Sequence, residues 1–278
     1  SQMATRFRTR VGESLATIEK YSTPLEKMTT SSLEALQAYS AGYKTSITAG
    51  RVRADPLFKR AVAIDPDFAI AHAQVGFGYS GIGESALARA SLLKAYQLRD
   101  RASDVERFNI DTFYDRDFAG NLEREQRTLE SWAASYPRDS GAHGLISGLA
   151  LSGTGQYELA IAEADRAIAL DPDLAPAYAN KARNQLHLNR LDDAMLTMSR
   201  AAERKLEVPN FLLFQYFVAF LKGSDDELER SAEGARKNPA TEDEISHLEA
   251  LALARSGQLQ DARRMSAVPV EIAQRAGR

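Results

Sequence analysis

One glycine-rich segment has the spacing of a cofactor-binding motif. Gly76-Phe77-Gly78-Tyr79-Ser80-Gly81 reads G-x-G-x-x-G. This motif binds a dinucleotide when it joins a strand to a helix and an acidic residue follows about 20 positions later. Here the flanking sequence predicts a helix, and Asp100 falls in a predicted turn. We therefore interpret the segment as helix packing, in a helix that is kinked or weak because each internal glycine costs about 1 kcal/mol.

Other polar groups suggest metal or phosphate chemistry without completing a site. Asp65-Pro66-Asp67 and Asp171-Pro172-Asp173 resemble metal-binding carboxylate pairs, but the central proline is typical of turns. Ser152-Gly153-Thr154-Gly155 lacks the Lys-Ser/Thr of a phosphate loop. The chain has no cysteine. Its four histidines have no zinc-site spacing: His72, His143, His187 and His247. We predict no catalytic residue, cofactor or metal, and a protein that is not an enzyme.

Composition sets limits on the partners of this chain. With 278 residues, 44% of them hydrophobic and 26% charged, it is long and apolar enough to form an ordered core. A net charge of −3 gives no reason to expect nucleic acid as a partner. No apolar run approaches the roughly 18 residues that span a bilayer, so we expect no direct membrane insertion. We expect a cytoplasmic location by default, and an extracytoplasmic one if the segment follows a membrane span.

Residues 141–206 contain one pattern twice, 34 residues apart. Small residues at the eighth position, Gly148 and then Ala182, allow two helices to approach closely. Gly155 ends the first helix, because glycine adopts the left-handed conformation at low cost, and Pro172 ends the second. Each period thus predicts a pair of antiparallel helices. One pair cannot bury its own apolar face, so the copies must stack.

Small or glycine residues at positions 8, 15, 20 and 27, with proline at 32, resemble the tetratricopeptide repeat. The pattern recurs along most of the chain, as in Gly42, Ala54, Ala61, Pro66, Gly76, Gly83, Ala88, Ala95, Gly223 and Gly257. This resemblance implies an all-α fold, a right-handed superhelical solenoid of about seven helix-turn-helix repeats. We place the array at residues 35–278, with units that start near 35, 69, 106, 141, 175, 209 and 243.

Two units depart from the pattern. About four extra residues lie between Asp100 and Pro137, which predicts a lengthened first helix or a longer loop around residues 116–121. In the sixth unit Tyr216 stands where a small residue belongs, and Pro239 comes one place early.

Residues 1–34 precede the array and contain a predicted amphipathic helix with Phe7, Val11, Leu15 and Ile18 on one face. We interpret this helix as a cap or as the tail of an upstream domain. Residues 12–15, 23–26 and 29–36 resemble the junction before the C-terminal repeat region of large bacterial serine/threonine kinases. That resemblance implies a kinase domain and a membrane segment upstream, although no kinase motif lies in this sequence.

The C-terminal end carries a further predicted helix, with Val270, Ile272, Ala273 and Ala276. It has no polar cap, which terminal repeats usually need. We expect either that the array continues beyond Arg278 or that this end self-associates.

The resemblance also implies a binding groove lined by the first helices, at positions 5, 6 and 9 of each unit. The candidate groove residues are Tyr39, Tyr43, Gln74, Phe77, Asp111, Tyr114, Asn180, Arg183 and Phe217. Aromatic side chains there favour a protein or peptide partner. The alternative, packing between neighbouring helices, stays open for each residue. The carboxylate clamp of chaperone-tail binders is not predicted, because Tyr39, Tyr43, Gln74 and Arg107 replace its lysine and asparagine residues.

The predicted function is therefore a non-catalytic protein–protein interaction scaffold that binds a peptide or partner segment in the concave groove. The alternative is a sensory or regulatory C-terminal region of a bacterial serine/threonine kinase.

Overall fold

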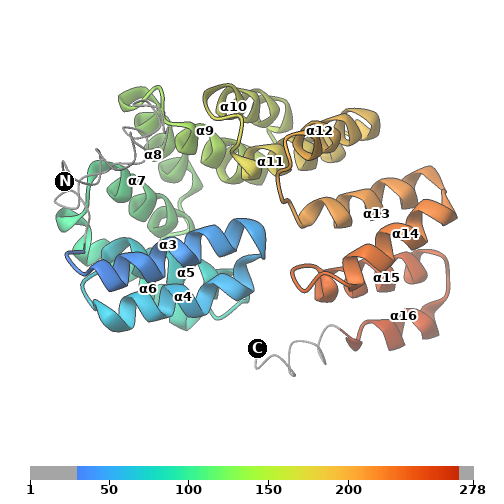
Figure 1. Cartoon of the computed structure of the whole chain (residues 1–278), viewed down its shortest axis with the longest axis horizontal. Helices are drawn as coiled ribbons and strands as arrows, with labels where there is room; N and C mark the ends of the chain where they lie inside the picture. The colour runs from blue at the N-terminus through green and yellow to red at the C-terminus, as the bar shows by residue number, and fades with distance from the viewer. Residues whose placement is uncertain (1–29, 269–278) are drawn as a thin grey trace, which may run out of the picture. The chain divides into compact units, whose positions relative to one another are not determined.

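The computed structural model describes residues 30–268, and this part of the chain is all-α, without a strand (Figure 1). The predicted helices at residues 7–18 and 270–276 lie outside it. The α-helices are α3 (Leu33–Thr48), α4 (Arg51–Ile64), α5 (Ala69–Gly81), α6 (Ser85–Leu98), α7 (Asp104–Phe113), α8 (Leu122–Ser135), α9 (Ser140–Leu145), α10 (Tyr157–Leu170), α11 (Ala175–His187), α12 (Leu191–Glu203), α13 (Asn210–Lys222), α14 (Asp225–Arg236), α15 (Glu242–Arg255) and α16 (Leu259–Met265). A 3₁₀ turn, η2 (Arg99–Arg101), and two π-helical turns, η3 (Tyr114–Phe118) and η4 (Ile146–Leu151), complete the described elements.

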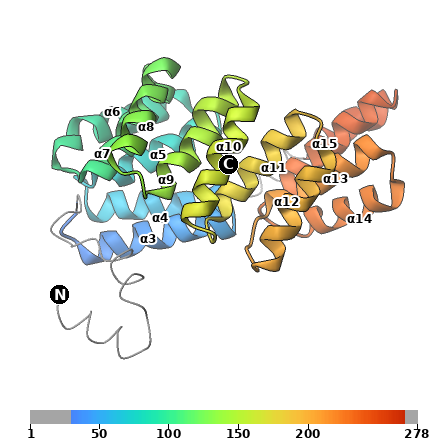
Figure 2. The same cartoon turned by 90° about the horizontal axis from the view of Figure 1, so that it is seen from above.

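The helices fall into two compact units. Among the described residues, one contains residues 30–41 and 55–121, and the other contains residues 42–54 and 122–268. Within the units, consecutive helices pack as pairs, such as α5 with α6, α11 with α12, and α13 with α14. The first helices of successive pairs are also neighbours: α5 contacts α7, α11 contacts α13, and α13 contacts α15 (Figure 2). No helix between residues 30 and 268 has both the length and the apolar character needed to cross a membrane.

The turn inside each helix pair depends on one residue in the left-handed conformation. Gly155 has φ of 76° and Asn189, its counterpart one repeat later, has φ of 57°. Asparagine is among the few non-glycine residues that tolerate this region. Left-handed glycines occupy the other turns, at Gly50, Gly83, Gly120, Gly223 and Gly257. Gly50 and Gly120 were not predicted as turn residues from the repeat pattern.

Small residues let the two helices of a pair approach closely. On α10 the buried positions are Ala160, Ala164 and Ala167, each without solvent exposure. In the α5–α6 pair, a Cβ added at Gly76 would lie 2.6 Å from Leu92 Cγ and 3.2 Å from the backbone oxygen of Ala88. The helix α5 runs unbroken through the glycine-rich segment. That segment is therefore a packing surface inside a helix, not a strand-to-helix turn.

The extra residues of the third unit lengthen its first helix. The π turn η3 directly extends α7, and only residues 119–121 separate η3 from α8. Of the two expected alternatives, the lengthened helix is the one observed. In the sixth pair, Tyr216 is buried with Ala232, Ala235 and Ile245, so a large side chain replaces the small one inside that core.

The π turn η4 changes the role of Gly148. A Cβ added at Gly148 would lie 2.5 Å from Asn180 Nδ2 on α11, whereas one added at Gly76 would meet Leu92 on its own partner helix. The predicted equivalence of Gly148 with Gly76 was therefore wrong. A π turn contains an additional residue, which rotates the following side chains around the helix axis. Ser147, the residue before Gly148, is fully buried.

Two glycine substitutions in α5 test the close approach. Gly76→Ala should lower the free energy of unfolding by about 1–2 kcal/mol, because the clash with Leu92 and the Ala88 carbonyl outweighs the gain in helix propensity. Gly81→Ala should be neutral or stabilising by up to about 1 kcal/mol, since no atom lies within 4 Å of the added Cβ. Urea midpoints followed by circular dichroism measure both. Equal shifts would show that the α5–α6 crossing does not need glycine.

Candidate partner-binding surface

The candidate surface consists of the side chains on the first helix of each pair, here called the first-helix face: α3, α5, α7 with η3, α9 with η4, α11, α13 and α15. All nine predicted groove residues lie on these elements. Their surroundings differ from one helix to the next.

Two of the predicted aromatic residues pack against other rings. The ring of Tyr39, on α3, lies 5.6 Å from Phe58 and 5.2 Å from Phe68 between centroids. Phe77, on α5, stacks on Phe113 of α7 at 4.8 Å. Such ring pairs contribute about 0.5–1.5 kcal/mol beyond their area burial. These side chains hold neighbouring helices together, which is the packing alternative that the sequence left open.

Tyr114 and Asp111 belong to a second polar-aromatic cluster in the same unit. Tyr114 stacks between Tyr96 and Phe118, with centroids 3.9 and 4.5 Å away. The guanidinium carbon of Arg99 lies 3.6 Å from the Tyr96 centroid, and Arg99 Nε lies 3.6 Å from Asp111 Oδ1. The cation thus bridges the ring stack and the carboxylate. Both predicted residues are engaged within the fold.

Asn180 and Arg183 contact the helix that contains the π turn. Asn180 Nδ2 donates to the Gly144 carbonyl at 3.1 Å, and Arg183 Nη2 donates to the Gly148 carbonyl at 2.9 Å. Arg183 also donates to Asn180 Oδ1 at 3.3 Å. These two side chains therefore join α11 to α9 and η4. Their predicted contact with a partner came from the repeat position alone, because the sequence pattern does not indicate the π turn η4.

The three remaining predicted residues, Gln74, Tyr43 and Phe217, differ in how far they are exposed to solvent. Gln74 is buried on α5. Tyr43 is 49% exposed and Phe217 is 40% exposed. Leu251, at the position of α15 equivalent to Phe217, is 53% exposed, and Leu221 is also exposed on α13. The apolar surface on α13 and α15 is thus open to solvent, whereas the aromatic residues of α5 and α7 are largely packed.

The two Asp-Pro-Asp segments form turns and bind cations of the next repeat. The Asp67 amide donates to Asp65 Oδ1 at 3.0 Å, as in an Asx turn. Asp67 pairs with Arg101 at 2.8 Å, and Asp173 pairs with Arg204 at 2.7 Å. The hydrogen bond from Arg101 lowers the pKa of Asp67. Residues 30–268 contain no group of three or more potential ligands arranged to hold a metal ion.

One histidine makes a close polar contact. His143 Nδ1 lies 2.6 Å from Glu163 Oε2, linking α9 to α10. Glu163 also accepts a 2.5 Å hydrogen bond from Arg166. The carboxylate is shared between two side chains within one helix pair, which is a structural arrangement.

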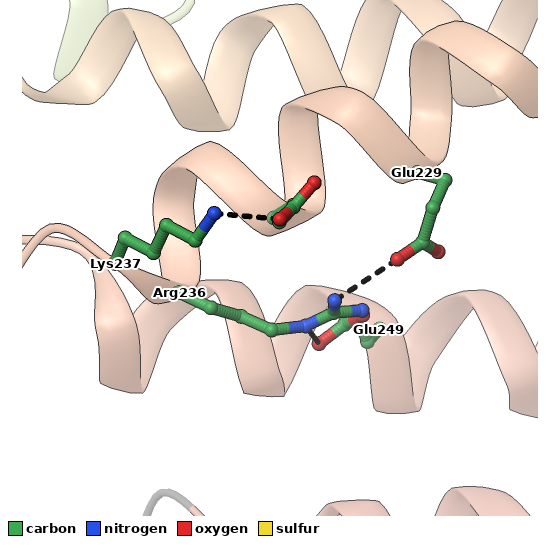
Figure 3. Close-up of polar contacts among 5 residues, drawn as sticks. Glu229, Arg236, Lys237 and Glu249 are labelled. Atoms are coloured by element: carbon green, nitrogen blue, oxygen red, sulfur yellow. Dashed lines mark hydrogen bonds and ion pairs between the residues drawn. The ribbon is translucent and has the colours of Figure 1, made fainter.

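A charged network links the sixth and seventh helix pairs (Figure 3). Arg236, on α14, binds both oxygens of Glu249 on α15, through Nη2 to Oε1 and through Nε to Oε2 at 3.3 Å. Its Nη1 donates to Glu229 at 3.1 Å. The hydrogen bond with Glu249 raises the pKa of Arg236 above its usual value. The pair of Arg236 with Glu249 was not predicted from the sequence, because the two residues lie on different helices and no helical spacing relates them.

Arg236 and Lys237 are adjacent cations with different surroundings, which gives a matched test. Arg236→Met would leave the largely buried Glu249 carboxylate without its cation, and should weaken the α14–α15 contact by about 1–3 kcal/mol. Lys237→Met removes a solvent-exposed pair with Glu233 and should cause no measurable change. Hydrogen exchange of the α15 amides reports the local free energy of opening. Equal protection in both variants would contradict a structural role for Arg236.

Comparisons with known proteins agree with the arrangement of helix pairs. Residues 145–174 match the tetratricopeptide repeat family. The search of curated proteins gives no match. A tetratricopeptide repeat protein from Parabacteroides merdae is similar over 89% of this chain and 94% of its own, with 13% identity and a TM-score of 0.54. A human IFIT1 dimer with PPP-AAAA is similar over 87% of this chain and 59% of its own, with 16% identity and a TM-score of 0.58. The chain therefore folds as a tetratricopeptide repeat array.

Proposed function

We propose that this chain is a non-catalytic scaffold that holds a peptide or a segment of a partner protein against the first-helix face. Arrays of this fold generally mediate protein–protein interactions and are generally not enzymes. Their extended surface is formed by equivalent positions of successive repeats, so a partner can contact several repeats at once.

The exposed apolar side chains of α13 and α15 are the observation that carries this proposal. Phe217 and Leu251 occupy equivalent positions on neighbouring helices, and both are exposed. Leu221 adds a further exposed side chain one turn after Phe217. Equivalent large apolar groups exposed on adjacent helices form a contiguous patch, which is typical of an interaction site. We call Phe217, Leu221 and Leu251 the apolar patch.

Acidic residues lie on the same helix as part of this patch. Asp243, Glu244, His247 and Leu248 line a depression of about 360 Å³ on α15. Burial, and then the nearby Asp243, raises the pKa of Glu244. A partner segment with apolar anchors and a basic flank suits this combination, because opposite charges steer association and fix the orientation.

The packed aromatic residues have a different role in this proposal. Tyr39 packs against Phe68 at the start of α5, and Phe77 joins α5 to α7. Tyr114 packs η3 against Tyr96 of α6. A rigid surface binds with a smaller loss of conformational entropy than a mobile one. Among the predicted groove residues, Phe217 and Tyr43 remain the ones proposed to contact a partner directly.

A regulatory region of a bacterial serine/threonine kinase is the second candidate function. It is supported by the resemblance of residues 12–36 to the junction found in such kinases. The reading frame upstream of Ser1 tests it, since a kinase domain must precede the array.

Serine variants of exposed apolar residues, with a control leucine matched in exposure, test the scaffold proposal. Peptides selected on the immobilised full chain should bind Leu251→Ser and Phe217→Ser at least about 10-fold more weakly, because each substitution removes a desolvated anchor. The control is Leu196→Ser on α12, a second helix, where the leucine is 50% exposed compared with 53% for Leu251. It should stay within about 2-fold of the parent chain.

Fluorescence anisotropy of labelled peptides gives the Kd values, and circular dichroism verifies that each variant is folded. An equal loss of affinity in Leu196→Ser and Leu251→Ser would reject the first-helix face as the binding surface.

A further inference from the structure

A pocket of about 450 Å³ lies among α13, α14, α15 and α16. Its apolar walls include Phe220, Leu228, Leu253 and Met265. None of the three residues of the apolar patch lines it. Its volume is within the range of small-molecule sites, roughly 300–1,000 Å³. The pocket is thus separate from the surface of the proposed scaffold function.

One hydroxyl in this pocket has unused hydrogen-bonding capacity. The Tyr216 residue as a whole is only 5% exposed and lines the pocket. Among residues 30–268 its hydroxyl forms no hydrogen bond, and the oxygen itself stays accessible. Burial, followed by the nearby Glu249, raises the pKa of Tyr216 to about 12, so the phenol is neutral at physiological pH. A hydroxyl that is accessible and unpaired on the wall of a pocket can accept a hydrogen bond from a ligand or a water there.

The charges around the pocket are acidic. Asp225 and Glu249 line it, and no lysine, arginine or histidine does. Arg236 binds both Glu249 and Glu229 through different guanidinium nitrogens, so these three side chains together keep one net negative charge. Removal of an ion from water is expensive unless charge of the opposite sign surrounds it. These walls therefore favour a cation over an anion.

The helix ends that line the pocket also contribute mostly negative partial charge. The C-terminal turns of α13 and α15 line the pocket through Phe220 and Leu253, and helix C-termini carry partial negative charge. The N-terminus of α14 opposes them with partial positive charge. Asp225, the first residue of α14, offsets that charge with its carboxylate.

We propose that this pocket binds an organic cation, a guanidinium or primary ammonium group on an apolar stem. The Tyr216 oxygen accepts a hydrogen bond from the cation, while Glu249 and Asp225 supply the opposite charge. The ring of Phe220 and the aliphatic walls contact the stem. Such a group occurs both on small amines and on arginine or lysine side chains of proteins, and the two sources are separated by the experiment.

The test uses the full chain and two probes of nearly equal shape. n-Butylguanidinium carries the charge, and n-butylurea is its neutral counterpart. Isothermal titration at pH 7 should give a Kd at least about 10-fold lower for the guanidinium. A blocked Gly-Arg-Gly peptide forms the second arm. Binding of both cations would assign the site to a protein side chain, and binding of butylguanidinium alone would assign it to a small molecule.

Variants then locate the site. Tyr216→Phe keeps the ring and removes the hydroxyl, and should weaken butylguanidinium at least about 5-fold. Asp225→Asn, at an exposed position, should weaken it by about 2-fold or more without unfolding the chain. Tyr157→Phe on α10 is the control, because Tyr157 stacks on His187 outside the pocket. Equal binding of urea and guanidinium, or equal losses in Tyr216→Phe and Tyr157→Phe, would overturn the proposal.

Discussion

The close approach of the two helices in each pair is the constraint on which the rest of the structure depends. In most pairs it depends on side chains no larger than alanine at the crossing, as at Ala160, Ala164 and Ala167, or none, as at Gly76, whereas the sixth pair buries Tyr216 there. Helices this close bury only one side of the pair, and the other must pack on the next pair. A stack of pairs is therefore the stable solution. The left-handed turn residues, such as Gly155 and Asn189, reverse the chain within the space that this packing leaves.

The π turns show how the array accommodates additional residues. An extra residue in a helix rotates all later side chains relative to the earlier ones. In η4 this turns Gly148 toward α11, where Asn180 and Arg183 bind the Gly144 and Gly148 carbonyls. Polar groups thus take over contacts that small apolar residues make elsewhere. The consequence for function is that α11 presents fewer free polar groups than its sequence indicates.

Charge pairs act differently at the surface and in the interior of the stack. The pairs of Asp67 with Arg101 and of Asp173 with Arg204 join successive turns at the surface, where solvent screening keeps their contribution small. Arg236 and Glu249 meet between helices, and there the carboxylate depends on its cation. The same acidic surroundings, with the unpaired Tyr216 hydroxyl, distinguish the α13–α16 pocket from the rest of the second unit.

The sequence by itself determined the fold class and the repeat, because small residues that recur in most units at an interval of 34 indicate closely packed helices, and Gly83, Gly155, Asn189, Gly223 and Gly257 indicate the turns. It also identified the first helices as the elements that carry the candidate surface. Only the tertiary structure decided which of those residues are open to solvent: Phe217 and Leu251 are exposed, whereas Phe77 and Tyr114 pack against other rings. The physical reason is that helical spacing gives the direction of a side chain, while its exposure depends on which side chains of the neighbouring helix fill the same space.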